Sequence, residues 1–178
     1  FLGAHVSLGA DQAGYYSTEP LRKTLEELAD FSLLNQGHPR LTVGAAHVRS
    51  SVMHYFDSRD MKLTPNHIMA SGALPPAFPA VRIDGELYWD GGILSNTPAE
   101  RIFEDNPRRN SLIFAVHLWN PTGSEPDTIW EILHRAKDIQ YSSRISSHIV
   151  RQREAHRLRH VINHLMRFVP DDAKKDPL

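Results

Sequence analysis

A short hairpin followed at once by two glycines constrains this chain more than any other stretch of its sequence. Residues 81–83 and 86–89 are β-type runs separated by Asp84-Gly85. An Asp-Gly pair between two such runs predicts a tight hairpin, because both turn residues take positive φ. The hairpin ends at Asp90, directly before Gly91-Gly92. The sequence therefore predicts a carboxylate at a strand end.

Two interpretations of Asp90, Gly91 and Gly92 are open at this point. Glycines give the backbone conformations closed to other residues and leave the carboxylate unshielded by neighbouring side chains. That arrangement suits a catalytic acid or base. An isolated Asp-Gly-Gly can equally be an ordinary turn whose aspartate accepts a hydrogen bond from its own backbone.

The residues around Asp90 favour the catalytic interpretation. The block resembles the aspartate block of patatin-like phospholipases in five places: residues 69–76 (Met-Ala-Ser-Gly-Ala-Leu-Pro-Pro), Phe78-Pro79, 83–85 (Ile-Asp-Gly), 88–92 (Tyr-Trp-Asp-Gly-Gly) and 95–98 (Ser-Asn-Thr-Pro). That family has a three-layer α/β fold and hydrolyses lipid acyl esters with a serine-aspartate dyad. The resemblance implies that Asp90 is the dyad aspartate and that Gly91 and Gly92 are the motif glycines.

The nucleophile that the resemblance implies is absent from these 178 residues. In the family it lies in a Gly-x-Ser-x-Gly elbow upstream of the aspartate, after a glycine-rich oxyanion loop. No serine here has glycines two residues to either side, and Ser7 and Ser71 both fail this test. We therefore expect the chain to be the C-terminal portion of a serine lipid acyl hydrolase, inactive alone and completed by an upstream part of the same protein. The alternative is a divergent patatin-like scaffold that has lost its chemistry and binds lipid or a protein partner.

The composition limits the kinds of partner that the chain is expected to bind. The net charge of -1 predicts no general attraction to nucleic acid. The chain contains no cysteine, which excludes disulfides and thiolate metal sites but leaves the compartment open, with the cytoplasm favoured. No apolar run approaches the roughly 20 residues of a membrane span. We expect a soluble or peripheral membrane protein that needs no cofactor or metal for a serine-aspartate mechanism.

Before the hairpin, the sequence predicts an α/β pattern. Thr18 and Thr64 are expected to cap helices because each precedes favourable first-turn residues, including Pro20 and Pro65. The expected elements are a loop over 1–16, a helix from 18 with Leu21, Leu25 and Leu28 packed on the sheet, paired strands over 41–48 and 52–56, and a helix ending near Gly72.

The segment between this second helix and the hairpin has two interpretations. Leu74, Pro75, Pro76 and Phe78 could form an apolar rim that meets acyl chains. They could equally form a proline-stiffened connection packed on the surface. The sequence leaves both open.

After the glycine pair, Thr97 and Pro98 predict the start of a helix over 99–104. A helix N-terminus near Asp90 would favour its charged form. The most apolar run in the chain, residues 111–119, predicts a central strand.

From Thr128 the spacing predicts one or two long helices. Residues 138–144 also resemble a segment that follows the aspartate block in bacterial patatin-like proteins. An apolar stripe continues to Met166 beside several arginines, which suits either peripheral contact with an anionic membrane or packing on the chain's own domain with solvated arginines. His156, His160 and His164 share one helix face. The sequence places no carboxylate on that face with them, so the pattern does not favour a metal site.

These elements assemble into one expected organisation. Residues 1–126 are predicted to be the C-terminal part of a three-layer patatin-like α/β domain. Residues 127–169 are predicted to form a helical extension, and residues 170–178 a polar tail.

Overall fold

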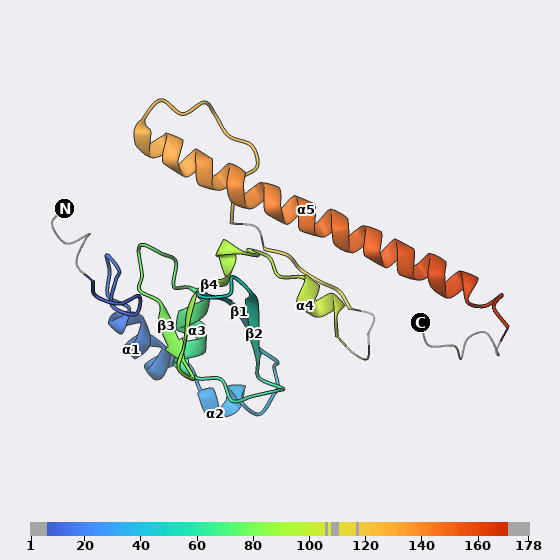
Figure 1. Ribbon diagram of the computed structural model, residues 1–178, viewed down its shortest axis with the longest axis horizontal. Helices are drawn as coiled ribbons and strands as arrows, with labels where there is room; N and C mark the ends of the chain where they lie inside the picture. Colours follow the sequence, from blue (N-terminus) through green and yellow to red (C-terminus); the bar gives the residue numbers. More distant parts are fainter. Residues whose placement is uncertain (1–6, 106, 108–110, 117, 171–178) are drawn as a thin grey trace. The chain divides into compact units, whose positions relative to one another are not determined.

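The computed structural model describes residues 7–105, 107, 111–116 and 118–170, with side chains except at 143–145 and 148. The chain divides into two units, Phe1–Pro98 and Ala99–Leu178 (Figure 1). The predicted division at residue 126 concerns the extent of the patatin-like domain and stays a prediction. Residues 1–6 of the predicted loop over 1–16, and residues 171–178 of the predicted tail over 170–178, lie outside the described residues.

A four-stranded antiparallel sheet organises the first unit. Its order is β2-β1-β4-β3, so the β1–β2 hairpin and the β3–β4 hairpin are joined by pairing between β1 and β4. The strands are β1 (Thr42–His47), β2 (Met53–Asp57), β3 (Val81–Ile83) and β4 (Glu86–Asp90). Both predicted hairpins are confirmed. Together with the helices, the sheet makes the predicted mixed α/β fold.

The β3–β4 turn has the geometry that its sequence predicts. Asp84 has a φ of 50° and Gly85 a φ of 87°. Two consecutive positive φ values give the turn a twist that matches the flanking strands, and aspartate and glycine tolerate this region best. The turn thereby fixes the register Val81↔Tyr88, which sets where β4 ends.

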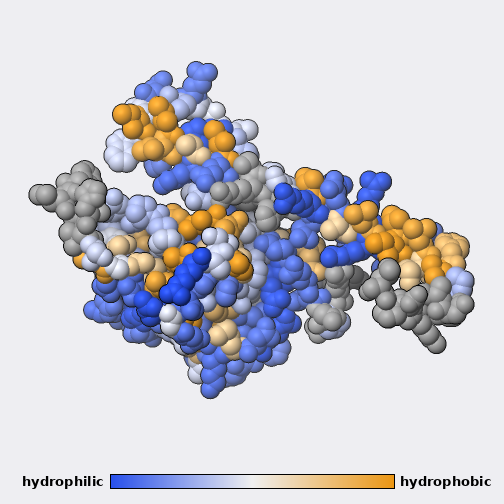
Figure 2. All heavy atoms as spheres, viewed as in Figure 1, coloured by the Kyte–Doolittle hydropathy of each residue, from blue (hydrophilic) through white to orange (hydrophobic). Residues whose placement is uncertain are grey.

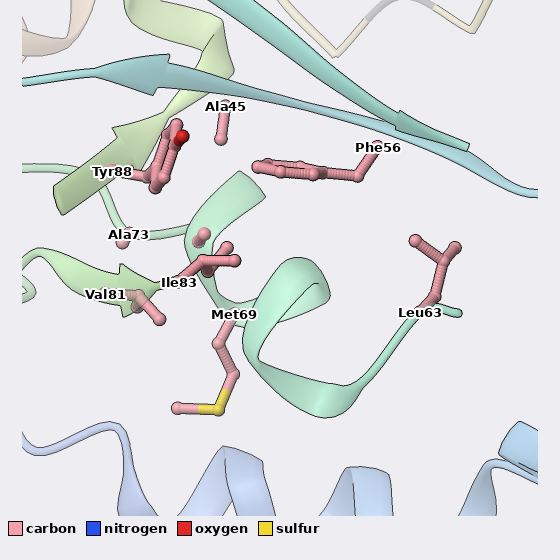
Figure 3. Packing of buried hydrophobic residues seen from close by; sticks show 9 residues of the cluster. Ala45, Phe56, Leu63, Met69, Ala73, Val81, Ile83 and Tyr88 are labelled. Atoms are coloured by element: carbon pink, nitrogen blue, oxygen red, sulfur yellow. The ribbon is translucent and has the colours of Figure 1, made fainter. Parts of the chain in front are cut away.

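Helices cover one face of the sheet. The helical segments of the first unit are α1 (Glu19–Leu28), α2 (Phe31–Leu34), α3 (Pro65–Ser71) and the short 3-10 helix η2 (Gly91–Ile93). In Figure 3, α3 lies between the strands and α1. The first helix therefore packs on α3, with Leu25 against the core, rather than directly on the sheet as the sequence suggested.

The two predicted caps differ in outcome. At α3, the N–H of Thr64 and the hydroxyl of Thr64 both lie 2.9 Å from Nδ1 of His67, which closes the first turn. At α1, Thr18 makes no capping hydrogen bond through its side chain. The hydroxyl oxygen of Ser17 instead accepts from the N–H of Glu19 at 3.2 Å.

The core lies between the sheet and α3. Figure 3 shows Phe56 and Tyr88 from the sheet facing Met69 and Ala73, with Val81, Ile83 and Leu63 around them. The rings of Phe56 and Tyr88 meet edge to face with centroids 5.3 Å apart. Alternation along β3 buries Val81 and Ile83 and exposes Arg82, as expected for strands with one covered face.

A buried carboxylate fastens the end of β2. Asp57 is 1% exposed and accepts hydrogen bonds from both Arg40 and Thr42, with Arg40 Nε at 2.7 Å and Thr42 Oγ1 at 2.9 Å. Burial would raise the pKa of Asp57. The hydrogen bonds from Arg40, from the N–H of Arg59 and from Thr42 outweigh that effect and hold the pKa well below its usual range.

The described residues of the second unit form the helices α4 (Glu100–Phe103) and α5 (Ile129–Leu165). The helical pattern expected from Thr128 is confirmed, and Thr128 caps α5: its hydroxyl oxygen accepts from the N–H of Glu131 at 3.2 Å, and the Glu131 carboxylate accepts in return from the N–H of Thr128. The long C-terminal helical region is thus one 37-residue helix. No helix in the described part of the chain has the length and apolarity needed to cross a bilayer.

The predicted strand over residues 111–119 is wrong for the residues described there. Residues 111–116 and 118–119 have no regular secondary structure, and Leu112 and Phe114 are each 82% exposed. An apolar run becomes a buried strand only where a neighbouring strand pairs with its backbone and another layer covers its side chains. The described residues supply neither at this segment.

The loop after this run is held against α5. The rings of Trp119 and Tyr141 stack with centroids 4.7 Å apart. Arg135 donates hydrogen bonds to the carbonyl oxygens of Asn120 and Pro121, each at 2.9 Å. Most of these contacts lie in the first third of α5.

Candidate active site

Asp90 lies at the last position of β4, where the sheet gives way to a turn. It is opposite Ala45 of β1. On its other side β3 does not reach Asp90, since Val81, the first residue of β3, pairs with Tyr88. The N–H of Asp90 instead donates to the carbonyl oxygen of Ala73 at 3.0 Å. The loop after α3 thus continues the ladder beside β4 and fixes the backbone from which the carboxylate projects.

The turn after Asp90 passes so close to β1 that only glycine fits at position 91. A Cβ on Gly91 would lie 2.3 Å from the carbonyl oxygen of Gly44 and 2.7 Å from its carbonyl carbon. The carbonyl oxygen of Gly91 then accepts from the N–H groups of Leu94 and Ser95. Close approach to β1 and a compact turn therefore explain this glycine, and its partner Gly44 carries no signal in the sequence that reveals the contact.

One hydrogen bond orients the carboxylate of Asp90. The N–H of Gly92 donates to Oδ1 at 2.7 Å, and within the described residues no second donor reaches the side chain. Asp90 is half-buried. Burial raises the pKa of Asp90, and the Gly92 hydrogen bond opposes but does not cancel that shift. The result is a carboxylate that is more basic than a solvated one.

This direction corrects the expectation that a nearby helix would stabilise the charge of Asp90. The predicted helix over 99–104 is the four-residue α4, which begins at Glu100. Its N-cap position is Ala99, and Thr97 does not cap it. A helix of four residues has few aligned peptide dipoles, so its N-terminus carries little of the positive charge that the prediction assumed. Desolvation is the larger influence.

The predicted rim lies beside the N-terminal segment of the described chain. Leu74, Pro75 and Phe78 are half-buried, whereas Pro76 is exposed. The carbonyl oxygen of Pro76 accepts from the N–H of Tyr15 at 3.1 Å, and the rings of Phe78 and Tyr16 lie 6.1 Å apart. The rim is therefore braced by a second segment, and its contact with acyl chains stays a prediction.

A second hydrogen-bonded group, which the sequence did not suggest, lies at the opposite end of the same strands. Nδ1 of His47 is 2.7 Å from Oγ of Ser50, and Nε2 of His47 is 3.1 Å from Oε2 of Glu86. The N–H of Ser50 also donates to Nδ1 at 3.3 Å, which makes this nitrogen an acceptor. The ring thus joins the β1–β2 turn to β4. Both donors to Nδ1 belong to Ser50 in the exposed turn, so we interpret the group as a structural contact that holds this turn against β4.

The three histidines predicted on one face belong to α5. The rings of His156 and His160 meet edge to face with centroids 4.8 Å apart. Among the described residues, no group of three or more histidine, aspartate or glutamate side chains is arranged to hold a metal ion.

A comparison with models of known protein families finds a match over the region that contains Asp90. A family model described as patatin-like phospholipase matches residues 2–103, more than half of the chain. The chain belongs to the patatin-like phospholipase family. A second model, described as patatin phospholipase, matches residues 139–178, which overlaps the C-terminal segment that resembled patatin-like proteins. No curated protein matches the chain.

Membership of the patatin-like family supports a lipid hydrolase function in general terms. The first match spans all of β1 to β4, the rim and the Asp90 turn. The first unit is accordingly the family's own scaffold around the candidate site. Which residues perform chemistry there is a separate question, because a fold and the site placed on it can diverge.

Proposed function

We propose that this chain carries the general base of a patatin-like lipid acyl hydrolase, with Asp90 as the base. The observation that carries the proposal is the state of its carboxylate: half-buried, held by the single N–H of Gly92, and raised in pKa by burial. A base works best when its pKa lies closer to the operating pH, and burial is the usual way a carboxylate reaches that range.

The nucleophile in this proposal is a serine that precedes residue 1 in the complete protein. As its Oγ attacks an ester carbonyl carbon, its proton passes to the free carboxylate oxygen of Asp90. Collapse of the tetrahedral intermediate breaks the acyl–oxygen bond, and the leaving alcohol takes that proton. Asp90 then accepts a proton from water as the water attacks the acyl-serine. When this second intermediate collapses, the serine Oγ leaves and takes that proton from Asp90, which releases the fatty acid and regenerates the serine and the carboxylate.

The rigid support of Asp90 fits this role. Its N–H is held by Ala73, and the turn that follows is packed onto Gly44. A base fixed by backbone contacts keeps its position when substrate binds, so less of the activation barrier goes into ordering it. The rim starts at Leu74, directly after Ala73 in the chain. In this proposal, Leu74 and Phe78 supply apolar surface for an acyl chain.

The test uses the full-length protein and an acyl ester substrate. Asp90→Asn keeps the size of the side chain and removes its basicity, so we expect turnover to fall by about 100-fold or more. The matched control is Asp84→Asn, because Asp84 is exposed in the hairpin turn and asparagine accepts its positive φ of 50°. Near-normal turnover in Asp90→Asn, with the control also normal, refutes the assignment.

A serine-directed fluorophosphonate probe locates the nucleophile independently. Labelling of the full-length protein but not of residues 1–178 alone supports the upstream serine. Labelling of a serine within these residues contradicts that part of the proposal. The absence of Gly-x-Ser-x-Gly from this sequence favours one second candidate, a non-catalytic scaffold that binds lipid or a protein. Labelling of neither form supports that candidate.

A further inference from the structure

The last turns of α5 carry an exposed apolar stripe. It consists of Leu158, Val161, Ile162 and Leu165, whose exposed fractions lie between 48% and 62%. Their spacing of three, four and seven residues places them on one helix face. Figure 2 shows hydrophobic atoms gathered at this end of α5, toward the right of the view. Phe168, which follows the helix, is also exposed and extends the apolar surface.

Arginines lie on both sides of this stripe. At 100° per residue, Arg157 and Arg159 are about 90° and about 110° from its centre, in opposite directions. Side chains of this length can bury their methylene groups beside an apolar surface while the guanidinium reaches outward. A guanidinium also matches the geometry of a phosphate group. The arrangement is that of a helix lying in an interface between an apolar and an anionic layer.

The charge of this segment stands out from the rest of the chain. Residues 150–168, here called the basic segment, contain five arginines and one glutamate, a formal charge of +4. The whole chain has a formal charge of -1, so the remaining residues carry -5. An anionic partner is therefore attracted to the basic segment and repelled on average by the rest of the chain.

We infer that the basic segment is a surface that binds an anionic lipid bilayer, with the stripe inserted among the acyl chains and the flanking arginines at the headgroup phosphates. The stripe supplies burial of apolar area, and the arginines supply attraction to the surface. Both contributions are needed for stable peripheral binding. This surface extends the proposed function, because it would hold a lipid hydrolase at its substrate.

Charge also distinguishes a bilayer from a second copy of the chain. Two copies joined stripe to stripe would bring two segments of +4 together, with Glu154 the single acidic residue in each. Like charges that flank a helix interface destabilise it. The first part of α5 gives an internal comparison: Ile132 and Leu133 are exposed there, but the charged residues around them are balanced (Glu131, Arg135, Lys137 and Asp138).

The test is co-sedimentation of the full-length protein with vesicles of phosphatidylcholine alone or with phosphatidylserine added to about 30 mol%. We expect binding to the anionic vesicles that weakens steeply as salt rises to about 1 M, where the Debye length is about 3 Å. Arg157→Gln with Arg159→Gln should weaken the binding about 25-fold, since each basic residue contributes about fivefold. Val161→Gln with Leu165→Gln should remove it.

Two control pairs remove the same number of charges, or of exposed apolar side chains, as the test pairs, but outside the basic segment. Lys23→Gln with Lys137→Gln removes the same two charges at exposed sites outside the basic segment. Ile132→Gln with Leu133→Gln removes exposed apolar side chains from the same helix. Both should leave binding within about twofold of the parent. Glutamine is a good helix former, and circular dichroism confirms that each variant keeps its helix.

Three outcomes overturn the inference: equal binding to both vesicle types, no effect of the arginine pair, or equal loss in the controls. A dimer in sedimentation that Val161→Gln with Leu165→Gln abolishes, without vesicle binding, assigns the stripe to a second copy instead and also overturns it. The inference builds on the proposed function for its meaning, but vesicle binding requires no hydrolysis. Failure of Asp90 as a base therefore leaves this result unchanged, and failure of binding leaves the Asp90 test unchanged.

Discussion

Replacing Gly91 by alanine should destabilise the first unit because the added methyl group meets backbone. The Cβ of alanine would lie 2.3 Å from the carbonyl oxygen of Gly44, more than 1 Å inside an ordinary contact. The obstacle cannot rotate away, since Gly44 pairs with Tyr55 of β2 and its neighbour Ala45 pairs with Asp90. Relief requires β1 and β4 to separate near the site.

The size of the effect follows from this geometry. Overpacking of a well-packed region costs about 1–3 kcal/mol, and rigid backbone places this case at about 3 kcal/mol. That is a large share of the about 5–15 kcal/mol by which a domain is stable. For a chain of this size it corresponds to a fall in Tm of about 6–12 °C.

The measurement is urea and thermal unfolding followed by circular dichroism, with Gly72→Ala as the matched control. Gly72 ends α3 with a φ of -116°, and a Cβ there would have no atom within 4 Å. Alanine at this position should be neutral or slightly stabilising, because it reduces the freedom of the unfolded chain. If Gly91→Ala is as stable as Gly72→Ala, the close approach of the Asp90 turn to β1 is refuted.

Two further predictions concern ionisable groups in the first unit. Asp57→Asn should reduce the free energy of unfolding by about 3–5 kcal/mol, because Arg40 loses its buried counter-ion. The control Asp11→Asn breaks the exposed ion pair with Arg82 and should change the free energy of unfolding far less. Equal effects of the two variants in urea unfolding would contradict the role of burial. The free energy of unfolding should also fall as the pH drops below about 6.5. Burial lowers the pKa of His67 in the folded state, so the unfolded chain binds a proton at a higher pH than the folded chain does. The free energy of unfolding can then change by up to about 1.4 kcal/mol per pH unit. His67→Gln should flatten this slope in unfolding measured from about pH 7 to about pH 5, and an unchanged slope would assign it to other groups.

The local elements of the first unit could be predicted because each depends on neighbours in the sequence. Asp84-Gly85 favours positive φ at both turn positions whatever surrounds it, and the structure has φ values of 50° and 87° there. Thr64-Pro65 marks a helix start through the same kind of local preference. The Asp90 block was recognisable for a different reason, since its residues resemble a family pattern that the later match bears out.

Long-range contacts explain where prediction failed. Residues 111–119 have the composition of a buried strand, but a strand needs a partner, and no property of the run itself supplies one. The direction of the pKa shift of Asp90 was misjudged for a similar reason. Its distance along the chain from α4 says nothing of how much of its carboxylate the fold removes from water, and burial shifts the pKa upward.

The sequence by itself determined the β3–β4 hairpin, the start of α3, the family and the choice of Asp90 as the candidate site residue, because these follow from local conformational preference and from residues adjacent in the chain. Only the tertiary structure decided how Asp90 is held. The carbonyl of Ala73 that fixes its backbone and the approach of Gly44 that requires Gly91 come from segments about 17 and 47 residues away. Such contacts form when the sheet closes, since the backbone groups that make them are common to every residue and carry no signature in the sequence.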